Sequence, residues 1–145
     1  MTAEIHNDVI VATTRIKAPP DVVFPYFTDA ALIVEWIGEQ AELDPRPGGL
    51  FLLDFGTIAA RGTYTSVDPP HRVAFSWGIP GSESLPPGGS TVEVVLTADG
   101  DGTIVVLSHR GVPPGRIDEH RTGWQQQFGR LAGIEPSSRV RRATA

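Results

Sequence analysis

The sequence predicts an α+β fold in which a curved, seven-stranded antiparallel sheet wraps around one long C-terminal helix, with two short helices after the first strand. Three observations predict it: short runs of strand-forming residues alternate with polar ones, clusters of Gly and Pro separate these runs, and an amphipathic helical stripe closes the chain. Parallel strands would need helical crossovers, and none lies between the later runs, so the sheet is expected to be antiparallel.

The first strand is predicted over residues 8–17, which are rich in Val, Ile and Thr, and two prolines end it. A short helix over residues 22–27 follows, because proline suits the first turn of a helix. Thr28 or Asp29 can cap a second helix, which is expected to run to about Ile37. These two helices are expected to close one end of the sheet.

Six further runs show the alternation of strands that have one buried and one solvated face. They cover residues 40–44, 50–55, 60–67, 72–78, 91–97 and 103–109. Val67 breaks the alternation of its run, which predicts a β-bulge near Ser66. The two Asp-Gly pairs within residues 98–102 predict a tight hairpin, since these residues tolerate positive φ.

A long amphipathic helix is predicted over residues 116–133. Its inward stripe, at spacings of three and four, consists of Ile117, His120, Trp124, Phe128 and Leu131. Gly123 and Gly129 inside the helix each cost about 1 kcal/mol relative to Ala, and close approach of the helix backbone to the sheet is the expected reason. This helix is the only predicted element large enough to cover the apolar face of the sheet.

A twisted sheet of seven strands curls, so one helix laid into its concave face need not fill it. The leftover space is expected to be an apolar pocket for a small molecule. The residues expected to line this cavity are Phe27, Trp36, Phe51, Leu53, Tyr64, Phe75, Trp77, Val94, Leu107, His109, His120, Trp124 and Phe128.

Length, charge and cysteine content exclude several classes of protein. The chain has 145 residues and a formal charge of -5, which fits one domain, predicted over residues 1–136, and argues against a nucleic-acid or anionic-membrane partner. The absence of cysteine excludes disulfides and thiolate nucleophiles. The N-terminus lacks signal-peptide features and no run is apolar enough to span a membrane, so a cytoplasmic location is expected. Residues 137–145 are predicted to form a flexible basic tail.

Several short motifs occur along the chain, each once, in an order typical of one family. They are residues 18–24 (Ala-Pro-Pro-Asp-Val-Val-Phe), 27–29 (Phe-Thr-Asp) with Trp36, 44–49 (Asp-Pro-Arg-Pro-Gly-Gly), 61–64 (Arg-Gly-Thr-Tyr), 67–70 (Val-Asp-Pro-Pro), 75–77 (Phe-Ser-Trp), 108–109 (Ser-His) and 123–124 (Gly-Trp). Together they resemble the family of homologues of the activator of the 90-kDa heat shock protein ATPase, within the START and Bet v 1-like superfamily. The resemblance covers residues 8–133 and implies a helix-grip fold with a hydrophobic cavity between the sheet and the long helix. It implies function less closely, because relatives include lipid binders, hormone receptors and polyketide cyclases.

The sequence lacks the usual catalytic signatures, such as a GxSxG nucleophile turn, a phosphate-binding loop or an HExxH zinc motif. Two histidines fall on inward positions, His109 on the last strand and His120 on the long helix. They are either core histidines bonded to the backbone or to each other, or a polar anchor or general acid/base for a ligand oxygen. A metal site would need a third ligand, and none is placed, so no metal or cofactor is expected. His71 and His6, the latter in an N-terminus expected to be mobile, are expected to be solvated.

Three further features bear on the site. Arg46 is expected to be structural, either holding its proline-flanked turn or pairing with a carboxylate such as Asp44. Tyr64 can offer its hydroxyl to a ligand or to the backbone. The long loop over residues 80–89 is either a lid over the pocket mouth, together with the loop over residues 111–115, or a loose loop in solvent.

The leading hypothesis is a module that binds a small hydrophobic or aromatic molecule, oriented by His109, His120 or Tyr64. One alternative is an enzyme of the polyketide cyclase or dehydratase type, in which a histidine moves protons within a positioned substrate. The other is a protein-interaction domain similar to a chaperone co-regulator, which predicts an exposed apolar patch and a pocket collapsed by side chains. Whether the chain forms a homodimer is left open.

Overall fold

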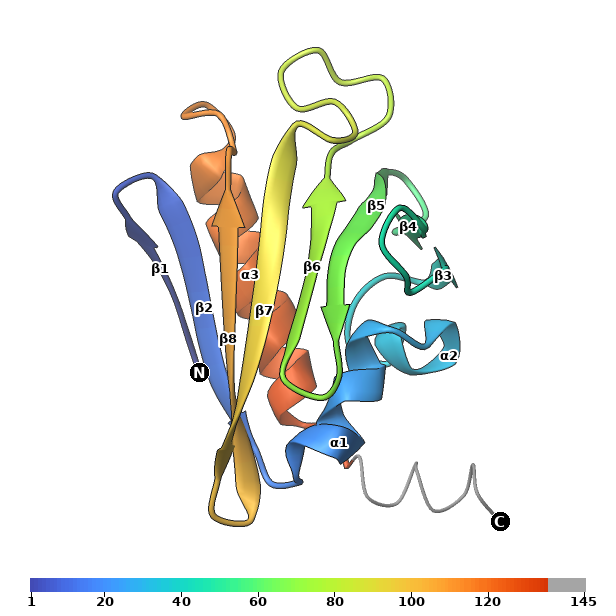
Figure 1. Ribbon diagram of the computed structural model, residues 1–145. Coiled ribbons are helices and arrows are strands. Elements are labelled where there is room, and N and C mark those ends of the chain that lie inside the picture. The colour runs from blue at the N-terminus through green and yellow to red at the C-terminus, as the bar shows by residue number, and fades with distance from the viewer. Residues whose placement is uncertain (136–145) are drawn as a thin grey trace.

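The computed structural model describes residues 1–135 and shows the predicted α+β architecture, in which a curved antiparallel sheet wraps around a long helix (Figure 1). The predicted tail over residues 137–145 lies outside the described residues. The strands are β1 (Thr2–His6), β2 (Val9–Ile16), β3 (Gln40–Leu43), β4 (Leu50–Asp54), β5 (Ala59–Asp68), β6 (Arg72–Trp77), β7 (Ser90–Asp99) and β8 (Gly102–Arg110). They form one sheet in the order β1-β2-β8-β7-β6-β5-β4-β3, and every neighbouring pair is antiparallel.

Short helices follow β2, and a long one ends the fold. They are α1 (Pro20–Val23), the 3-10 turn η1 (Phe24–Phe27), α2 (Ala30–Ile33) and α3 (Ile117–Ala132). The Asp29 side chain caps α2 by accepting hydrogen bonds from two backbone N–H groups of its first turn. α2 ends at Ile33 rather than near Ile37, because the next turns use tighter bonds such as the one from Trp36 N–H to the Ile33 carbonyl. None of the helices within residues 1–135 has the length and apolar character that crossing a membrane requires.

The N-terminus forms a strand that the sequence pattern did not predict. β1 pairs with β2 in a tight hairpin, and Asn7 and Asp8 at its turn adopt positive φ values of 50° and 64°. Asn and Asp tolerate this left-handed conformation better than most residues, which explains why the chain can turn here. The expectation of a mobile N-terminus is therefore wrong, and the sheet has eight strands instead of seven.

Local features of the sheet agree with the sequence. The register between β5 and β6 shifts between Tyr64 and Ser66, which confirms the predicted bulge. β7 and β8 are joined by the predicted hairpin, whose Gly100 has a φ of 61°. Arg46 pairs with Asp44 across 2.8 Å between Nε and Oδ2, so it holds its own turn in the expected structural role.

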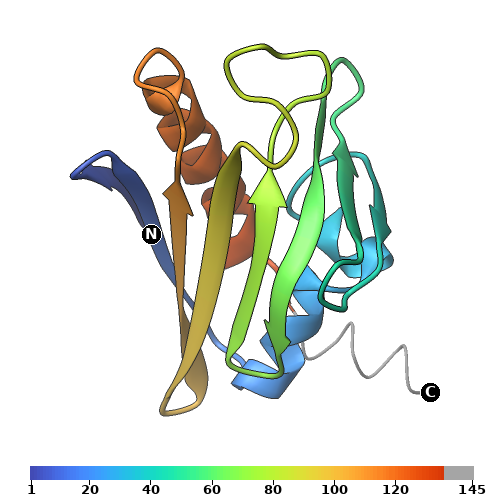
Figure 2. The same ribbon diagram turned by 45° about the horizontal axis from the view of Figure 1, so that its top comes forward.

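Helix α3 crosses the concave face of the sheet, and the short helices lie near one end of it (Figure 1 and Figure 2). Aromatic side chains fill much of the space between helix and sheet. Trp36 contacts Phe128 of α3 with ring centroids 5.9 Å apart, and Phe51 stacks on Phe75 at 3.9 Å. Much of the interior is therefore solid, and the open space lies toward the N-terminal half of α3.

Candidate functional site

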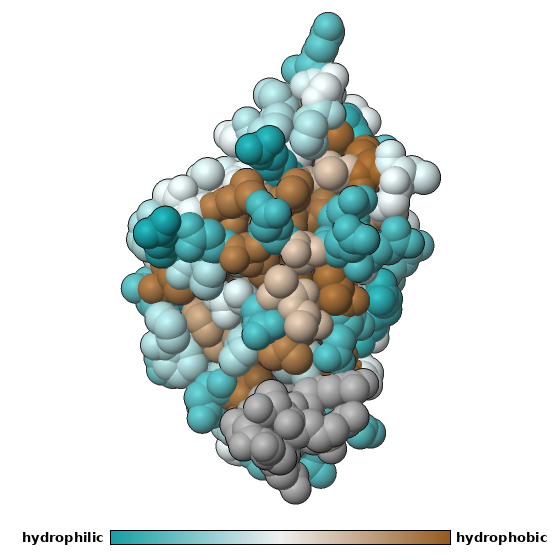
Figure 3. Space-filling model, turned by 90° about the vertical axis from the view of Figure 1, so that its right-hand side faces the viewer, coloured by the Kyte–Doolittle hydropathy of each residue, from teal (hydrophilic) through white to brown (hydrophobic). Residues whose placement is uncertain are grey.

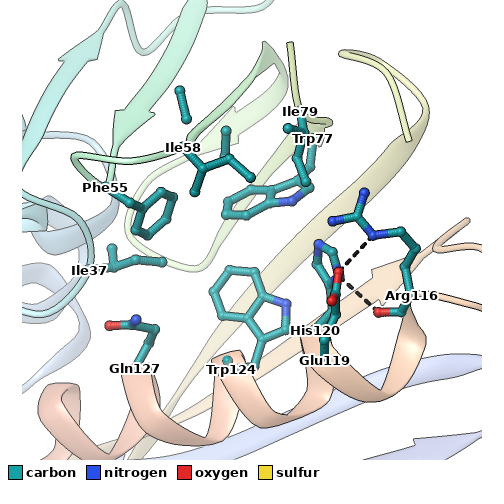
Figure 4. Close-up of a pocket in the computed structure, with 13 residues that line it drawn as sticks. Ile37, Phe55, Ile58, Trp77, Ile79, Arg116, Glu119, His120, Trp124 and Gln127 are labelled. Carbon is teal, nitrogen blue, oxygen red and sulfur yellow. Dashed lines mark hydrogen bonds and ion pairs between the residues drawn. The ribbon is translucent and has the colours of Figure 1, made fainter. Parts of the chain in front are cut away.

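A pocket of about 250 Å³ opens between the N-terminal half of α3 and the turn that joins β4 to β5 (Figure 4). Its apolar wall consists of Ile37, Phe55, Ile58, Ala59, Ala60 and Ile79. The polar residues on its α3 side are Arg116, Glu119, His120 and Gln127. Hydrophobic residues also reach the surface around β3, β4 and α2, where they gather between hydrophilic ones (Figure 3).

Two indole rings form the floor of the pocket. Trp77 is the last residue of β6 and is one of its buried residues, and Trp124 lies on the buried stripe of α3. Their ring centroids are 5.3 Å apart with the planes inclined by 49°, and the two side chains are 6% and 3% exposed. The indoles therefore bring sheet and helix together and separate the pocket from the core.

A chain of hydrogen bonds runs beneath this floor. Trp124 Nε1–H donates to Nδ1 of His109 across 3.0 Å. An indole N–H can only donate, so Nδ1 of His109 is unprotonated and the proton of the neutral ring sits on Nε2. Nε2–H donates to the Ser90 hydroxyl across 2.8 Å, and that hydroxyl donates to the Trp77 carbonyl, also across 2.8 Å.

His109 holds the floor in place and does not reach the pocket. The residue is fully buried, and both of its ring nitrogens are occupied by these bonds. Burial lowers the pKa of His109 to about 3, with a smaller contribution from the nearby His120. The imidazole is therefore uncharged at neutral pH and serves to orient Trp124.

His120 lies on the α3 wall of the pocket, beside Trp124 (Figure 4). Its Nδ1–H donates to the Arg116 carbonyl one turn earlier in the helix, across 3.0 Å. Because a carbonyl can only accept, the neutral ring carries its proton on Nδ1 and presents Nε2 as an acceptor. Residues 1–135 supply no hydrogen-bond donor to that Nε2. Burial lowers the pKa of His120, which favours this neutral form.

The indole N–H of Trp77 is buried and has no acceptor among the described residues. A buried donor without a partner costs roughly 1–3 kcal/mol. Figure 4 shows the nitrogen edge of this indole on the same side of the pocket as His120 and Arg116. The pocket therefore has one unused donor and one unused acceptor on one side.

Gly123 lines the pocket without a side chain to occupy it. A Cβ added at this position would meet no atom within 4 Å, so the space in front of the helix backbone is open. At Gly129, a Cβ would meet only the Met1 side chain, at 3.4 Å. The expectation that these glycines permit close approach of helix and sheet is therefore wrong, because no sheet backbone lies near either of them.

An ion pair and a packed loop form the rim. Arg116 Nε lies 2.7 Å from Glu119 Oε1, and the same guanidinium donates to the Ser82 hydroxyl across 3.3 Å. Ser82 belongs to the loop between β6 and β7, whose Leu85 is 1% exposed and accepts a backbone hydrogen bond from Ile79. The loop is thus packed on the domain beside the pocket rather than loose in solvent.

Of the residues expected to line the cavity, Trp77, His120 and Trp124 line this pocket. The others are at most 3% exposed and lie in the core: Phe27, Trp36, Phe51, Leu53, Tyr64, Phe75, Val94, Leu107, His109 and Phe128. The Tyr64 hydroxyl donates to the Phe27 carbonyl across 2.9 Å, so the backbone takes it rather than a ligand.

Sequence reasoning missed the outer wall of the pocket. Phe55 and Ile58 flank the turn between β4 and β5, and Gly123 and Gln127 lie on α3 outside its apolar stripe. Two signals could have found them. Large apolar residues are unusual in a turn, and Gly123 stands one helical turn before Gln127 on the same face.

Comparison with known proteins gives a family match. A family model described as "Activator of Hsp90 ATPase homolog 1-like protein" matches residues 17–134. None of the curated proteins matches the chain. Among solved structures, CalU16 from Micromonospora echinospora is 28% identical, with a TM-score of 0.72 over 90% of this chain and 78% of that one. PFC0360w, an HSP90 activator from Plasmodium falciparum, is 26% identical, with a TM-score of 0.71 over 86% of this chain and 94% of that one.

The same fold occurs in the Aha1 dimer from Colwellia psychrerythraea, at 17% identity and a TM-score of 0.75 over 86% of this chain and 92% of that one. The family match runs from the end of β2 through α3 and so includes every element that forms the pocket. It confirms the resemblance carried by the sequence motifs. The chain therefore belongs to the family of Activator of Hsp90 ATPase homolog 1-like proteins.

Proposed function

We propose that this chain binds a small apolar or aromatic molecule in the pocket between α3 and the β4–β5 turn. The observation that carries the proposal is the open, largely apolar volume of about 250 Å³ above the two indoles. A cavity of about 150 Å³ holds benzene, so this volume suits two fused aromatic rings. Burial of the ligand's apolar surface contributes roughly 25 cal/mol per Å².

Gly123 also supports a ligand, and the open volume argues against the main alternative. Gly123 keeps the volume open, because a side chain at this position would project into it. The alternative of a protein-interaction domain predicts a pocket collapsed by side chains, and the open volume favours a bound small molecule instead.

Isothermal titration with 2-methylnaphthalene tests the proposal, with a dissociation constant on the order of 10–100 µM expected for the wild type. Gly123→Leu fills the pocket from a position with nothing within 4 Å, so it is expected to abolish binding while the fold stays intact. Gly129→Leu is the matched control, since it makes the same change on the same helix beside Met1 and is expected to keep binding. No binding by the wild type, or equal binding by both variants, contradicts the proposal.

A second candidate is a proton-transfer enzyme, and one observation favours it: His120 lines the pocket with its Nε2 unpaired among the described residues. A neutral imidazole can take a proton from the carbon beside a bound ketone. In D2O, an enzyme of this kind would exchange the methyl protons of 2-acetylnaphthalene faster than buffer does. His120→Gln would lower the exchange rate to that in buffer while the ketone still binds. Exchange at the buffer rate would leave binding alone as the function.

A further inference from the structure

The two unused polar groups of the pocket define what a ligand must supply. Trp77 Nε1–H needs an acceptor, and it belongs to a side chain that is 6% exposed. His120 Nε2 needs a donor, because the Nδ1–H of the same ring is taken by the Arg116 carbonyl. Both rings pack on His109, with centroids 5.7 Å from it for Trp77 and 5.6 Å for His120.

From this pair we infer that the ligand is an aromatic alcohol, a two-ring phenol whose hydroxyl oxygen accepts from Trp77 Nε1–H and whose hydroxyl proton is donated to His120 Nε2. The inference rests on the proposed binding function and narrows its ligand class. A hydroxyl combines an acceptor and a donor at one atom. It satisfies both groups at once and removes the cost of the unpaired Trp77 donor.

Other polar groups fit only half of this arrangement. A ketone or ether oxygen accepts from Trp77 but leaves the lone pair of His120 facing it. An ammonium group can donate to His120 but would place a cation against the indole N–H. A carboxylate would face the His120 lone pair, and Arg116 at the rim already pairs with Glu119.

The surroundings of the pair are electrically balanced. His109 behind the floor is uncharged, because burial lowers its pKa. At the rim, the charges of Arg116 and Glu119 cancel. Desolvation in such a site disfavours an ionised ligand, so the neutral phenol is bound in preference to the phenolate.

Three naphthalenes that differ at one position test the inference: 2-naphthol, 2-methoxynaphthalene and 2-methylnaphthalene, titrated at pH 7 by calorimetry. The ether oxygen can accept a hydrogen bond but cannot donate one, and the methyl group of the third compound can neither accept nor donate one. The expected order of affinity is naphthol, then ether, then methyl compound. Each step is expected to be roughly 3-fold to 10-fold, the net contribution of one hydrogen bond.

Two variants assign each step to its residue. Trp77→Phe keeps an aromatic floor without the N–H, so it is expected to remove the preference for the ether over the methyl compound. His120→Phe removes the acceptor, so it is expected to remove the preference for naphthol over the ether. Thermal unfolding shows whether each variant is folded. If Trp77→Phe does not fold, the ratio of the affinities for naphthol and for the ether in His120→Phe still tests the phenol inference.

The outcomes separate the two proposals. Equal affinity of the wild type for all three compounds overturns the phenol inference and leaves the binding function standing. A preference for naphthol over the ether that persists in folded His120→Phe also overturns it. Failure of all three compounds to bind the wild type overturns the binding function and the inference together.

Discussion

The indole N–H of Trp124 donates to Nδ1 of His109 across 3.0 Å, and this bond ties helix α3 to strand β8. From His109 the hydrogen bonds continue through Ser90 to the Trp77 carbonyl, so α3, β8, β7 and β6 share one polar path. The two residues at its ends are the floor of the pocket. The position of the floor therefore depends on a neutral His109, since a protonated ring could not accept from Trp124.

Acid is expected to destabilise the fold through His109. Its pKa is about 3 in the folded protein against 6.5 as the reference value, so between these pH values the unfolded chain binds a proton that the folded chain does not. Protonation then favours unfolding. The free energy of unfolding is expected to be highest above pH 6.5 and to fall toward pH 3, by up to about 1.4 kcal/mol per pH unit. Urea denaturation at pH 7 and at pH 5 measures the slope.

His109→Gln is the control for this pH dependence. The amide oxygen of Gln can accept from Trp124 and its N–H can donate to Ser90, but the group does not titrate. In this variant the free energy of unfolding is expected to change less steeply with pH. The difference in slope corresponds to about one fewer proton taken up on unfolding. An unchanged slope would show that His109 is not the group that titrates.

Gly123→Ala is expected to raise the free energy of unfolding by about 1 kcal/mol, because Ala favours the helix and its methyl group meets no atom within 4 Å. The same methyl group takes space in the pocket, so 2-methylnaphthalene is expected to bind more weakly. Gly129→Ala should give a similar gain in urea denaturation without the loss of affinity. A drop in stability at position 123 would mean that the space there is not open.

Tyr64→Phe is expected to lower the free energy of unfolding by about 1–2 kcal/mol, because the buried Phe27 carbonyl loses its donor. The affinity for 2-naphthol is expected to stay the same, since the Tyr64 hydroxyl is bonded in the core. Denaturation and calorimetry on the same preparation measure both quantities. A clear loss of affinity in folded protein would instead place Tyr64 in contact with the ligand.

Leu85→Ala is expected to destabilise the protein by about 2–4 kcal/mol, since it leaves a cavity where the side chain is 1% exposed. The loop between β6 and β7 should open more often as a result. Hydrogen exchange of the Ile79 N–H, which donates to the Leu85 carbonyl, reports this opening. Exchange as slow as in the wild type would show that Leu85 does not anchor the loop.

Periodicity predicted the sheet and α3, because alternation and the three-and-four stripe are local properties of the chain. The sequence pattern did not predict strand β1, because this strand is only five residues long and Ala3 is its one buried residue. Its formation depends on pairing with β2, which is a tertiary contact.

The site was predicted in part for a similar reason. Inward parity identified Trp77, His120 and Trp124, but it could not tell pocket residues from core residues such as Phe51 and Phe75. That distinction depends on how the side-chain volumes fill the interior. The roles of the two histidines likewise depend on hydrogen-bond partners that only the folded chain brings together.

The central claim is that the ligand lies in this pocket and accepts a hydrogen bond from Trp77. The indole N–H resonances of the 15N-labelled protein test it most directly. Trp36 donates to the Tyr26 carbonyl across 3.0 Å and Trp124 to His109, while Trp77 has no acceptor among the described residues. Titration with 2-naphthol is expected to move the Trp77 resonance downfield until it saturates, because this N–H gains an acceptor, and to leave Trp36 in place. A Trp77 resonance that stays fixed while naphthol binds elsewhere would contradict the claim that this pocket holds the ligand.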